Sequence, residues 1–218
     1  MRRIAKSSPP NSFTTYALTQ GATFADIPSK IKDDLKESLL NEQGWICGYC
    51  QQVINDKSRA AIEHHCEQSI CNGQNNTQDR RLDYTNLLAV CFGNAGHWDM
   101  HCDAKKSQFT TKSGLPIKIS PWSVAHIAKI IYHSTGLITS SDSTHSNEIS
   151  KILNLNAKYL KSSRKEKFIR FYSLSTSNKV VLKDKLKRLL LKDMELSGNK
   201  FSNSFPGLSE FMFKRYNF

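Results

Sequence analysis

Cys47-Gly48-Tyr49-Cys50 opens the stretch of sequence that decides the fold, residues 45–106. Two thiolates separated by two residues can both reach one tetrahedral ion from a tight turn. This segment is therefore typical of one half of a zinc site. A redox pair is the competing interpretation, but no strand–helix–strand pattern surrounds these cysteines. Disulfides would need an oxidising compartment, and Met1-Arg2-Arg3-Ile4 does not resemble an export signal. Because a structural zinc ion takes four ligands, a zinc site here needs a second pair.

Cys91 and Cys102 can supply that second pair. Ten residues separate them, and this insertion contains His97 and His101, either of which could replace one thiolate. Thiolates and imidazole nitrogens are both ordinary zinc ligands. The sequence therefore predicts a structural Zn²⁺, with the two histidines as open alternatives, held by four cysteines: Cys47, Cys50, Cys91 and Cys102.

Cys66 and Cys71 lie between the two halves of the predicted zinc site. They do not fit the spacing of the other four cysteines, so we expect two free thiols in a reducing cytoplasm. A second metal ion or a redox switch is the alternative for this pair.

Acidic, histidine and asparagine side chains also lie between the cysteine pairs. Glu63 and His64 follow a short apolar run at 60–62, and Asn86 precedes a second run at 87–90. Such runs suit short strands beside a site that is held by metal rather than by a large core. Cys102-Asp103-Ala104-Lys105-Lys106 then closes the stretch.

This order of motifs resembles the zinc-stapled HNH endonucleases of the ββα-metal group. More narrowly, it resembles the PtuB-like HNH component of Septu-type and retron-associated antiphage systems. The resemblance rests on the motifs CGYC, IEHH, DYTNLLAVC and CDAKK and covers about residues 45–107. It implies an α+β fold: a small zinc-stapled ββα-metal HNH module of short strands plus a helix, with a preceding helix and a mostly α-helical basic C-terminal region.

The resemblance also implies roles for the residues between the cysteines. His64 is the general base that takes a proton from water, and Asn86 holds the loop and orients the His64 ring. Glu63 and Asp103 are ligands of a catalytic Mg²⁺ or Mn²⁺, which suits their hard oxygen donors.

Two departures from the family pattern leave alternatives open. The cysteines of the second pair are usually close together, unlike Cys91 and Cys102. In the family, a proline usually lies shortly after the histidine, but none follows His64 here. His65 is therefore an alternative general base, and Glu67 is an alternative ligand of the catalytic metal ion. In a regular strand, moreover, adjacent side chains point to opposite faces, so His64 would face away from Glu63.

The net charge of +12 lies entirely in the second half of the chain. Residues 1–111 carry as many acidic as basic side chains, whereas residues 112–218 carry 19 Lys and Arg against 7 Asp and Glu. Such asymmetry indicates a polyanionic partner, most often nucleic acid, although a solvated helical surface is the alternative. We expect phosphate contacts from Lys105, Lys106, Arg164, Lys165, Lys167 and Arg170. The family resemblance implies a different use of this half, as the docking surface for a PtuA-like ATPase within a retron complex.

Three parts follow from these patterns: an extended N-terminal arm (1–27), an HNH nuclease module with structural zinc (28–111) and a basic helical region for nucleic-acid or partner binding (112–218). Helical spacing over 31–43, with Ser29 as N-cap and Gly44 as stop, predicts a helix that leads into Cys47. Further predictions are helices at 122–135, 147–160 and 178–196, a polar linker at 72–81, a loop at 140–146 and a packed aromatic tail from 201.

The expected function is that of a metal-dependent HNH endonuclease that hydrolyses DNA, or RNA such as tRNA. The resemblance implies that the protein is the toxic effector of an antiphage system and is controlled by an ATPase partner. The alternative is a non-catalytic, zinc-containing adaptor that binds nucleic acid. The chain lacks the run of about 18 apolar residues that a membrane span needs, so we expect a cytoplasmic protein without a membrane partner.

Overall fold

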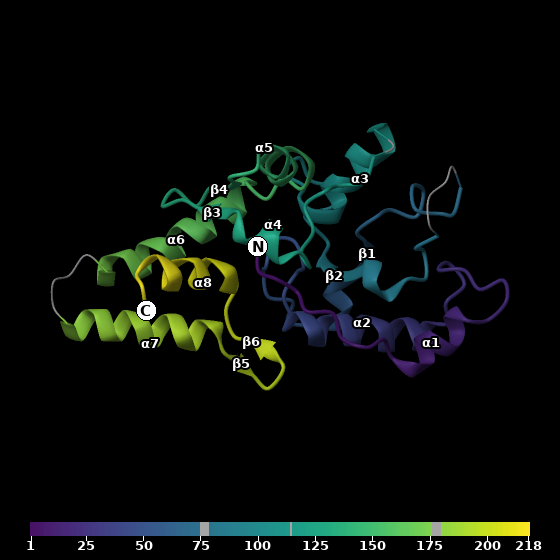
Figure 1. Cartoon of the computed structure of the whole chain (residues 1–218), viewed down its shortest axis with the longest axis horizontal. Helices are drawn as coiled ribbons and strands as arrows, with labels where there is room; N and C mark the ends of the chain where they lie inside the picture. The colour runs from purple at the N-terminus through teal and green to yellow at the C-terminus, as the bar shows by residue number, and fades with distance from the viewer. Residues whose placement is uncertain (75–78, 114, 176–179) are drawn as a thin grey trace.

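The computed structural model describes residues 1–74, 79–113, 115–175 and 180–218. Within these residues, helices combine with three short antiparallel strand pairs (Figure 1), which confirms the predicted α+β class. Residues 75–78 of the predicted polar linker and residues 178–179 of the last predicted helix lie outside the described residues.

The N-terminal segment packs into the fold, so the prediction of an extended arm over 1–27 is wrong. Helix α1 spans Asn11–Ala17, and the side chains of Phe13, Phe24 and Ile27 are buried. These apolar residues are widely spaced in a polar stretch and form no periodic pattern. Their burial therefore depends on tertiary contacts that the local sequence does not indicate.

Helix α2 (Ser29–Gln43) ends where the sequence predicts. Gly44 follows it with a left-handed backbone (φ 69°), as expected of a glycine that stops a helix. Pro28, rather than Ser29, occupies the N-cap position. The buried face of the helix carries Leu35, Leu39, Leu40 and Gln43.

Strands β1 (Ala60–His64) and β2 (Leu87–Cys91) pair in antiparallel fashion, as the two short apolar runs predict. Glu63 lies opposite Leu88 in this hairpin-like pair. Helix α3 (Cys102–Ser113) follows and packs against β2, which completes a ββα unit (Figure 1).

The middle of the chain forms shorter elements than the helices predicted for 122–135 and 147–160. Helix α4 (Val124–Ala128) is followed by β3 (Ile130–Tyr132), which pairs with β4 (Ile138–Ser140). Helix α5 (Ser143–Asn147) and a π-helix (Glu148–Ile152) replace the predicted loop and the start of the next helix. Strands of three residues are too short to show a clear alternation, so the sequence could not reveal them.

The C-terminal part consists mainly of helices. Helices α6 (Lys158–Ser175) and α7 (Val180–Met194) pack against each other, and α8 (Pro206–Arg215) packs on α7 (Figure 1). A small strand pair, β5 (Leu196–Ser197) with β6 (Lys200–Phe201), links α7 to α8. The aromatic tail thus folds back on the core, as predicted.

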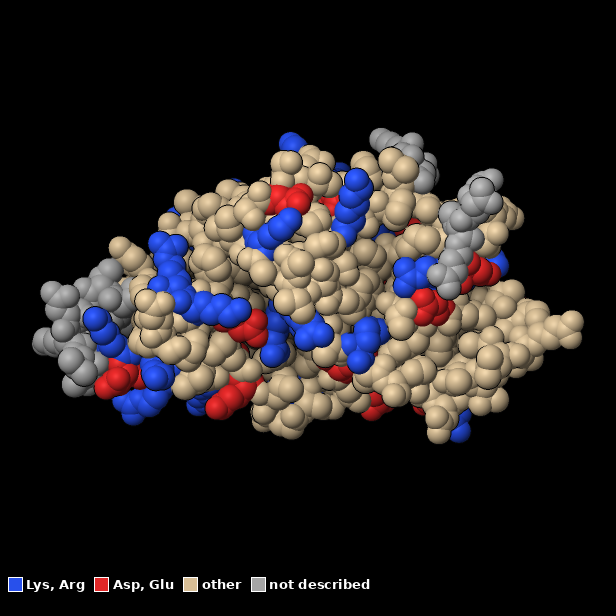
Figure 2. All heavy atoms as spheres, in the orientation of Figure 1, with Lys and Arg blue, Asp and Glu red and all other residues tan. Residues whose placement is uncertain are grey.

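One connected hydrophobic cluster extends from Phe13 and Leu39 near the N-terminus to Leu186 and Leu208 in the C-terminal helices. On the face shown in Figure 2, Lys and Arg side chains gather over the half built from α6, α7 and α8, with a few acidic side chains among them. Among the described residues, no helix combines the length and apolar character that crossing a membrane requires.

Candidate metal centre and catalytic site

The four cysteines that the sequence predicts as zinc ligands come together in the structure. Their sulfur atoms all lie within 4.8 Å of one another. The Sγ–Sγ distances are 3.7 Å for Cys47–Cys102, 3.7 Å for Cys50–Cys91 and 4.0 Å for Cys91–Cys102. A tetrahedral zinc ion with Zn–S bonds of about 2.3 Å needs sulfurs about 3.8 Å apart. The cluster could therefore hold a zinc ion.

Burial of these thiols creates a need for a cation. Desolvation raises the pKa values of Cys50 and Cys102 well above their usual range, whereas hydrogen bonds from the neighbouring thiols lower the pKa of Cys91. Four thiolates in such a cluster, three of them buried, can coexist only if a positive charge compensates them.

A closed loop brings Cys91 and Cys102 together despite the ten residues between them. The His101 N–H donates to the Gly93 carbonyl oxygen (2.8 Å), which pins the two ends of the loop. Gly93 has a φ of 57°, and a Cβ atom there would lie 1.9 Å from the His101 carbonyl oxygen. Only glycine fits this close approach, so the unusual spacing is compatible with a four-cysteine site.

The two histidines of this loop lie outside the sulfur cluster. His101 is buried, and its Nδ1 lies 3.1 Å from the Sγ of Cys102, where it can donate to a thiolate without replacing it. His97 is exposed, and its Nδ1 accepts from the Asp99 N–H (3.4 Å). The geometry thus favours four sulfur ligands, with His101 as their neighbour.

Glu63 is the central carboxylate of a second candidate site. Its Oε1 accepts from the Lys106 ammonium (2.5 Å) and from the Tyr49 hydroxyl (3.2 Å). Burial raises the pKa of Glu63 to about 8, with Lys106 opposing this shift and the adjacent Asp103 carboxyl adding to it. Asp103 lies in the first turn of α3, directly after Cys102, so the cysteine cluster helps to place it beside Glu63.

Lys106 is not the surface residue that the sequence predicts, because its side chain is completely buried. Its Nζ donates to Glu63 and to the His64 carbonyl oxygen (2.8 Å), and lies 3.2 Å from Glu67 Oε1. Lys106 is one helical turn after Cys102, so both residues share the face of α3 that meets the hairpin. This i, i+4 spacing from a predicted metal ligand is the signal that could have revealed its burial.

The His64 ring is anchored on one side. Its Nε2 lies 2.9 Å from the Arg81 carbonyl oxygen, which can only accept, so Nε2 carries the proton. The Phe24 ring packs edge-on against it, with ring centroids 4.3 Å apart. Burial lowers the pKa of His64, which keeps the ring neutral near pH 7 and leaves Nδ1 as the basic nitrogen. Among the described residues, Nδ1 has no hydrogen-bond partner.

Charge links His64 to the carboxylate site. The charges of Lys106 and Asp103 influence the pKa values of both Glu63 and His64. Lys106 contacts the side chain of Glu63 but only the backbone of His64, as expected if the two side chains leave the strand on opposite faces. His64 thus follows Glu63 in the strand, but its side chain does not touch the Glu63 side chain.

His65, the rival base, has the contacts of a core histidine. Its Nε2 lies 2.9 Å from the Ile119 carbonyl oxygen, and its ring packs edge-on against Trp122 at 4.8 Å between centroids. Burial lowers the pKa of His65 to about 4.

Asn86 is completely buried and binds the backbone of the loop between β1 and β2. Its Oδ1 accepts from the Cys66 N–H (2.8 Å), and its Nδ2 donates to the carbonyl oxygens of Cys66 (2.9 Å) and Arg80 (3.1 Å). Asn86 thus holds the loop just before Arg81, whose carbonyl oxygen orients the His64 ring. It acts on that ring through the backbone rather than by side-chain contact.

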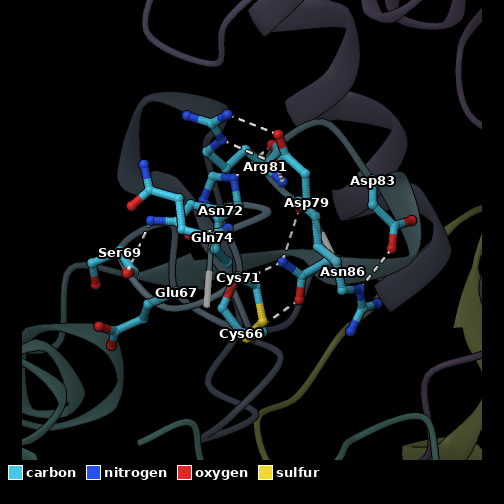
Figure 3. The surroundings of a disulfide bond; sticks show 12 residues. Cys66, Glu67, Ser69, Cys71, Asn72, Gln74, Asp79, Arg81, Asp83 and Asn86 are labelled. Atoms are coloured by element: carbon cyan, nitrogen blue, oxygen red, sulfur yellow. Dashed lines mark hydrogen bonds and ion pairs between the residues drawn. A yellow bond between two sulfur atoms is a disulfide. The ribbon is translucent and has the colours of Figure 1, made fainter. Parts of the chain in front are cut away.

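Cys66 and Cys71 form a disulfide (Figure 3), so the prediction of two free thiols is wrong. The chain turns sharply between them, because the N–H groups of Ile70 and Cys71 both donate to the Glu67 carbonyl oxygen. The turn brings the two Cα atoms to 5.9 Å, within the usual range for a disulfide.

Besides Lys106, two more of the six residues predicted to bind phosphate are internal. Arg164 is 2% exposed and donates to the carbonyl oxygens of Gly136 (2.8 Å) and Leu155 (2.6 Å). Lys167 pairs with Asp193 (2.5 Å), and its side chain is only 11% exposed. Both predictions are wrong, because the positive charges satisfy buried acceptors.

The other three predicted phosphate contacts lie at or near the surface. Lys165 and Arg170 are exposed on α6, and Lys105 is partly exposed on α3, where it donates to Gln108 (3.3 Å).

Comparison with known proteins gives a distant and partial match. A curated protein of Escherichia coli, named as the candidate HNH endonuclease of retron Ec83, is 27% identical to this chain over 86 residues. The match covers 36% of this chain and 33% of that protein, so the chain spans only about a third of its relative's length. No protein-family model matches the chain.

Proposed function

We propose that this protein is a metal-dependent HNH endonuclease that hydrolyses phosphodiester bonds of nucleic acid. The observation that carries the proposal is the pair of acidic side chains, Glu63 and Asp103, on the ββα unit, with the neutral His64 ring at the next position of the strand. The four-cysteine cluster adjoins this neighbourhood through Cys102 and Asp103. The distant similarity to an HNH endonuclease points to the same chemistry.

The carboxylates fit a hard divalent cation. Mg²⁺ and Mn²⁺ prefer oxygen donors, and Mg²⁺ commonly uses one or two carboxylates while substrate and water complete its coordination. When bound, such an ion stabilises the phosphate and the leaving oxygen. Lys106 keeps the buried Glu63 carboxylate in place, and the Tyr49 hydroxyl supports the same oxygen.

His64 is the proposed general base. The Arg81 carbonyl oxygen holds the proton on Nε2, so Nδ1 is free to accept a proton from water. The lowered pKa of His64 favours the neutral, proton-accepting ring at pH 7. Asn86 keeps the loop that carries Arg81 in position.

The proposed substrate is DNA, or RNA such as tRNA. Water as the nucleophile requires no 2′-hydroxyl, so the chemistry serves either polymer. The basic C-terminal region, residues 112–218, supports binding of phosphates without reading their sequence. The proposed contacts are the surface residues Lys105, Lys165 and Arg170.

We propose a role as the toxic effector of an antiphage system, in which a PtuA-like ATPase within a retron complex controls the nuclease. Support comes from the order of motifs in residues 45–107 and from the retron named for the E. coli relative. The division into a nuclease module (28–111) and a binding region (112–218) belongs to this proposal.

The alternative is a zinc-containing adaptor that binds nucleic acid without cutting it. One observation favours it: the Lys106 ammonium already pairs with Glu63 and Glu67, so a second ion is not needed to bring these side chains together. In that case the ion pair would be structural.

A cleavage assay separates the two functions. The zinc-loaded full chain is incubated with plasmid DNA and total RNA in Mg²⁺ or Mn²⁺, beside His64→Ala and a control, His133→Ala, which removes an exposed histidine outside the site. We expect wild type and His133→Ala to cut, and His64→Ala to cut at least about 100-fold more slowly. Equal cutting by His64→Ala would exclude His64 as the base. Binding without cutting by all three proteins would support the adaptor.

A further inference from the structure

The Cys66–Cys71 disulfide has no part in the mechanism above, yet it lies beside Asn86 (Figure 3) and directly after His65 in the sequence. Cys66 directly follows His65 and is buried, whereas Cys71 is partly exposed. Both backbone polar groups of Cys66 are held by Asn86. The disulfide thus ties the end of β1 to the turn that follows it.

One connection runs from the disulfide to the general base. The Arg80 N–H donates to the Cys71 carbonyl oxygen (3.0 Å), and the Arg80 carbonyl oxygen accepts from Asn86 (3.1 Å). The next residue, Arg81, supplies the carbonyl oxygen that accepts from His64 (2.9 Å). The acceptor that orients the base is therefore held by a backbone segment anchored on both Cys71 and Asn86.

A second connection runs to the carboxylate site. Glu67, within the disulfide-closed turn, places its Oε1 3.2 Å from the Lys106 ammonium. This oxygen is buried and makes no hydrogen bond, so its charge is compensated through the ion pair. Lys106 in turn binds Glu63 (2.5 Å). A change in the turn would therefore reach the proposed metal ligand.

We propose that the Cys66–Cys71 disulfide positions His64 and the Lys106–Glu63 pair for the nuclease reaction, and that a dithiol reductant lowers activity by opening it. This inference rests on the proposed function. Cys66 and Cys71 are positioning residues, because they act through Asn86, Arg81 and Glu67 rather than on the substrate.

The exchange reaction balances with a dithiol as the electron donor. A thiolate of the reductant attacks Cys71 Sγ, the more accessible sulfur, and the S–S bond breaks to release Cys66 as a thiolate that takes up a proton. The second thiol of the reductant then attacks the mixed disulfide, which releases Cys71 and leaves the reductant as a disulfide. Two electrons and two protons pass to the protein.

The test compares the zinc-loaded full chain before and after treatment with dithiothreitol, with zinc content and free thiols measured in both samples. After removal of the reductant, we expect plasmid cleavage in Mn²⁺ to fall at least about tenfold and to return on reoxidation. The Cys66→Ser/Cys71→Ser variant should cut slowly under both conditions. Ser69→Ala, an exposed change in the same turn, should keep the full redox response.

Two further measurements report positioning directly. The N–H groups of His65 and Cys66 donate to Asn86, so their amide hydrogen exchange should accelerate on reduction. The ¹⁵N shifts of the His64 ring should indicate a single Nε2–H tautomer in the oxidised protein and a mixture after reduction. A structural change that does not reach the His64 ring would leave its tautomer unchanged.

Equal cutting before and after verified reduction would overturn the inference. So would a fall in cutting that is matched by loss of zinc, because damage to the four-cysteine site would then explain it. If neither the oxidised nor the reduced protein cuts, the nuclease proposal fails. The amide hydrogen exchange data then test the positioning role of the disulfide by themselves. Faster exchange at His65 and Cys66 on reduction would then support the positioning role, and unchanged exchange would refute it.

Discussion

The Asn86 side chain is a buried amide that makes hydrogen bonds with three backbone groups near the candidate site. Replacing it with Ala would leave the Cys66 N–H and carbonyl and the Arg80 carbonyl without this partner. We expect Asn86→Ala to lower the free energy of unfolding by about 1–3 kcal/mol, the cost of burying unsatisfied polar groups. Urea unfolding measures this, and Ser69→Ala, a change at an exposed position in the same loop, should alter stability little.

The buried ring of His65 makes stability depend on pH. Burial lowers its pKa to about 4, against about 6.5 in the unfolded chain, so the folded state binds fewer protons between these values. The contribution of His65 to stability is therefore present above pH 6.5 and is lost as the pH falls toward 4. We expect this residue to account for about 2 kcal/mol of the decrease in unfolding free energy from pH 7 to pH 5.

Urea unfolding of wild type and His65→Gln at both pH values checks this contribution. Any loss of zinc at low pH affects both proteins, so the difference between them isolates the ring. The same pH dependence in the two proteins would contradict the assignment of His65 as a buried neutral histidine.

Two cationic side chains that the sequence places at the surface are buried in the structure. Lys106 and Arg164 are charged, and charge alone favours a solvated position. Each nevertheless occupies a core position of its helix: Lys106 follows Cys102 by four residues, and Arg164 lies between the buried Leu160 and Phe168 at the same spacing. Their partners, a carboxylate and backbone carbonyls, come from distant parts of the chain. The spacing was visible in the sequence, but the partners were not.

At the scale of elements, the loop between β2 and α3 determines whether four sulfurs can meet. We expect Gly93→Ala to weaken zinc binding, because its Cβ would collide with the His101 carbonyl oxygen and displace the loop that joins Cys91 to Cys102. Zinc retention against a chelator and the thermal midpoint should both fall.

Gly96→Ala is the matched control in the same loop. It also has a positive φ (83°), but no atom lies within 4 Å of the position of its Cβ. It should show only the backbone cost of about 1–2 kcal/mol and retain zinc. Equal effects of the two substitutions would contradict the role given to Gly93.

Elements with a strong local pattern were predictable, whereas those defined by contacts were not. Helix α2 has apolar residues at helical spacing and a glycine stop, and the hairpin of β1 and β2 has two apolar runs. Strands β3 and β4 and the Cys66–Cys71 disulfide have no comparable pattern, since their formation depends on how the chain turns between them. The same holds for the candidate site: motif order suggested Glu63, His64 and Asp103, whereas the contacts of Tyr49 and Lys106 with Glu63 depend on packing.

At the scale of the whole molecule, the positive charge of the second half is divided between the interior and the surface. Arg164 and Lys167 stabilise the interior, while Lys165 is exposed on the same helix. We expect Lys165→Glu to weaken binding to plasmid DNA and reduce the salt dependence of that binding, with no change in stability. Arg164→Ala should lower the thermal midpoint instead, because it leaves buried carbonyl groups unpaired.

Fluorescence anisotropy over a range of salt concentrations and thermal unfolding separate these effects. A Lys165→Glu protein that binds DNA as tightly as wild type at every salt concentration would indicate that α6 does not contact the phosphates.

The central claim is that Glu63 and Asp103 hold a divalent cation next to a zinc site. A crystal of the zinc-loaded protein grown in Mn²⁺, with anomalous scattering recorded for both metals, tests it most directly. We predict a zinc peak among the four cysteine sulfurs and a manganese peak between the carboxylates of Glu63 and Asp103. A zinc peak alone, with Glu63 still paired only to Lys106 and Tyr49, would contradict the claim and favour the adaptor.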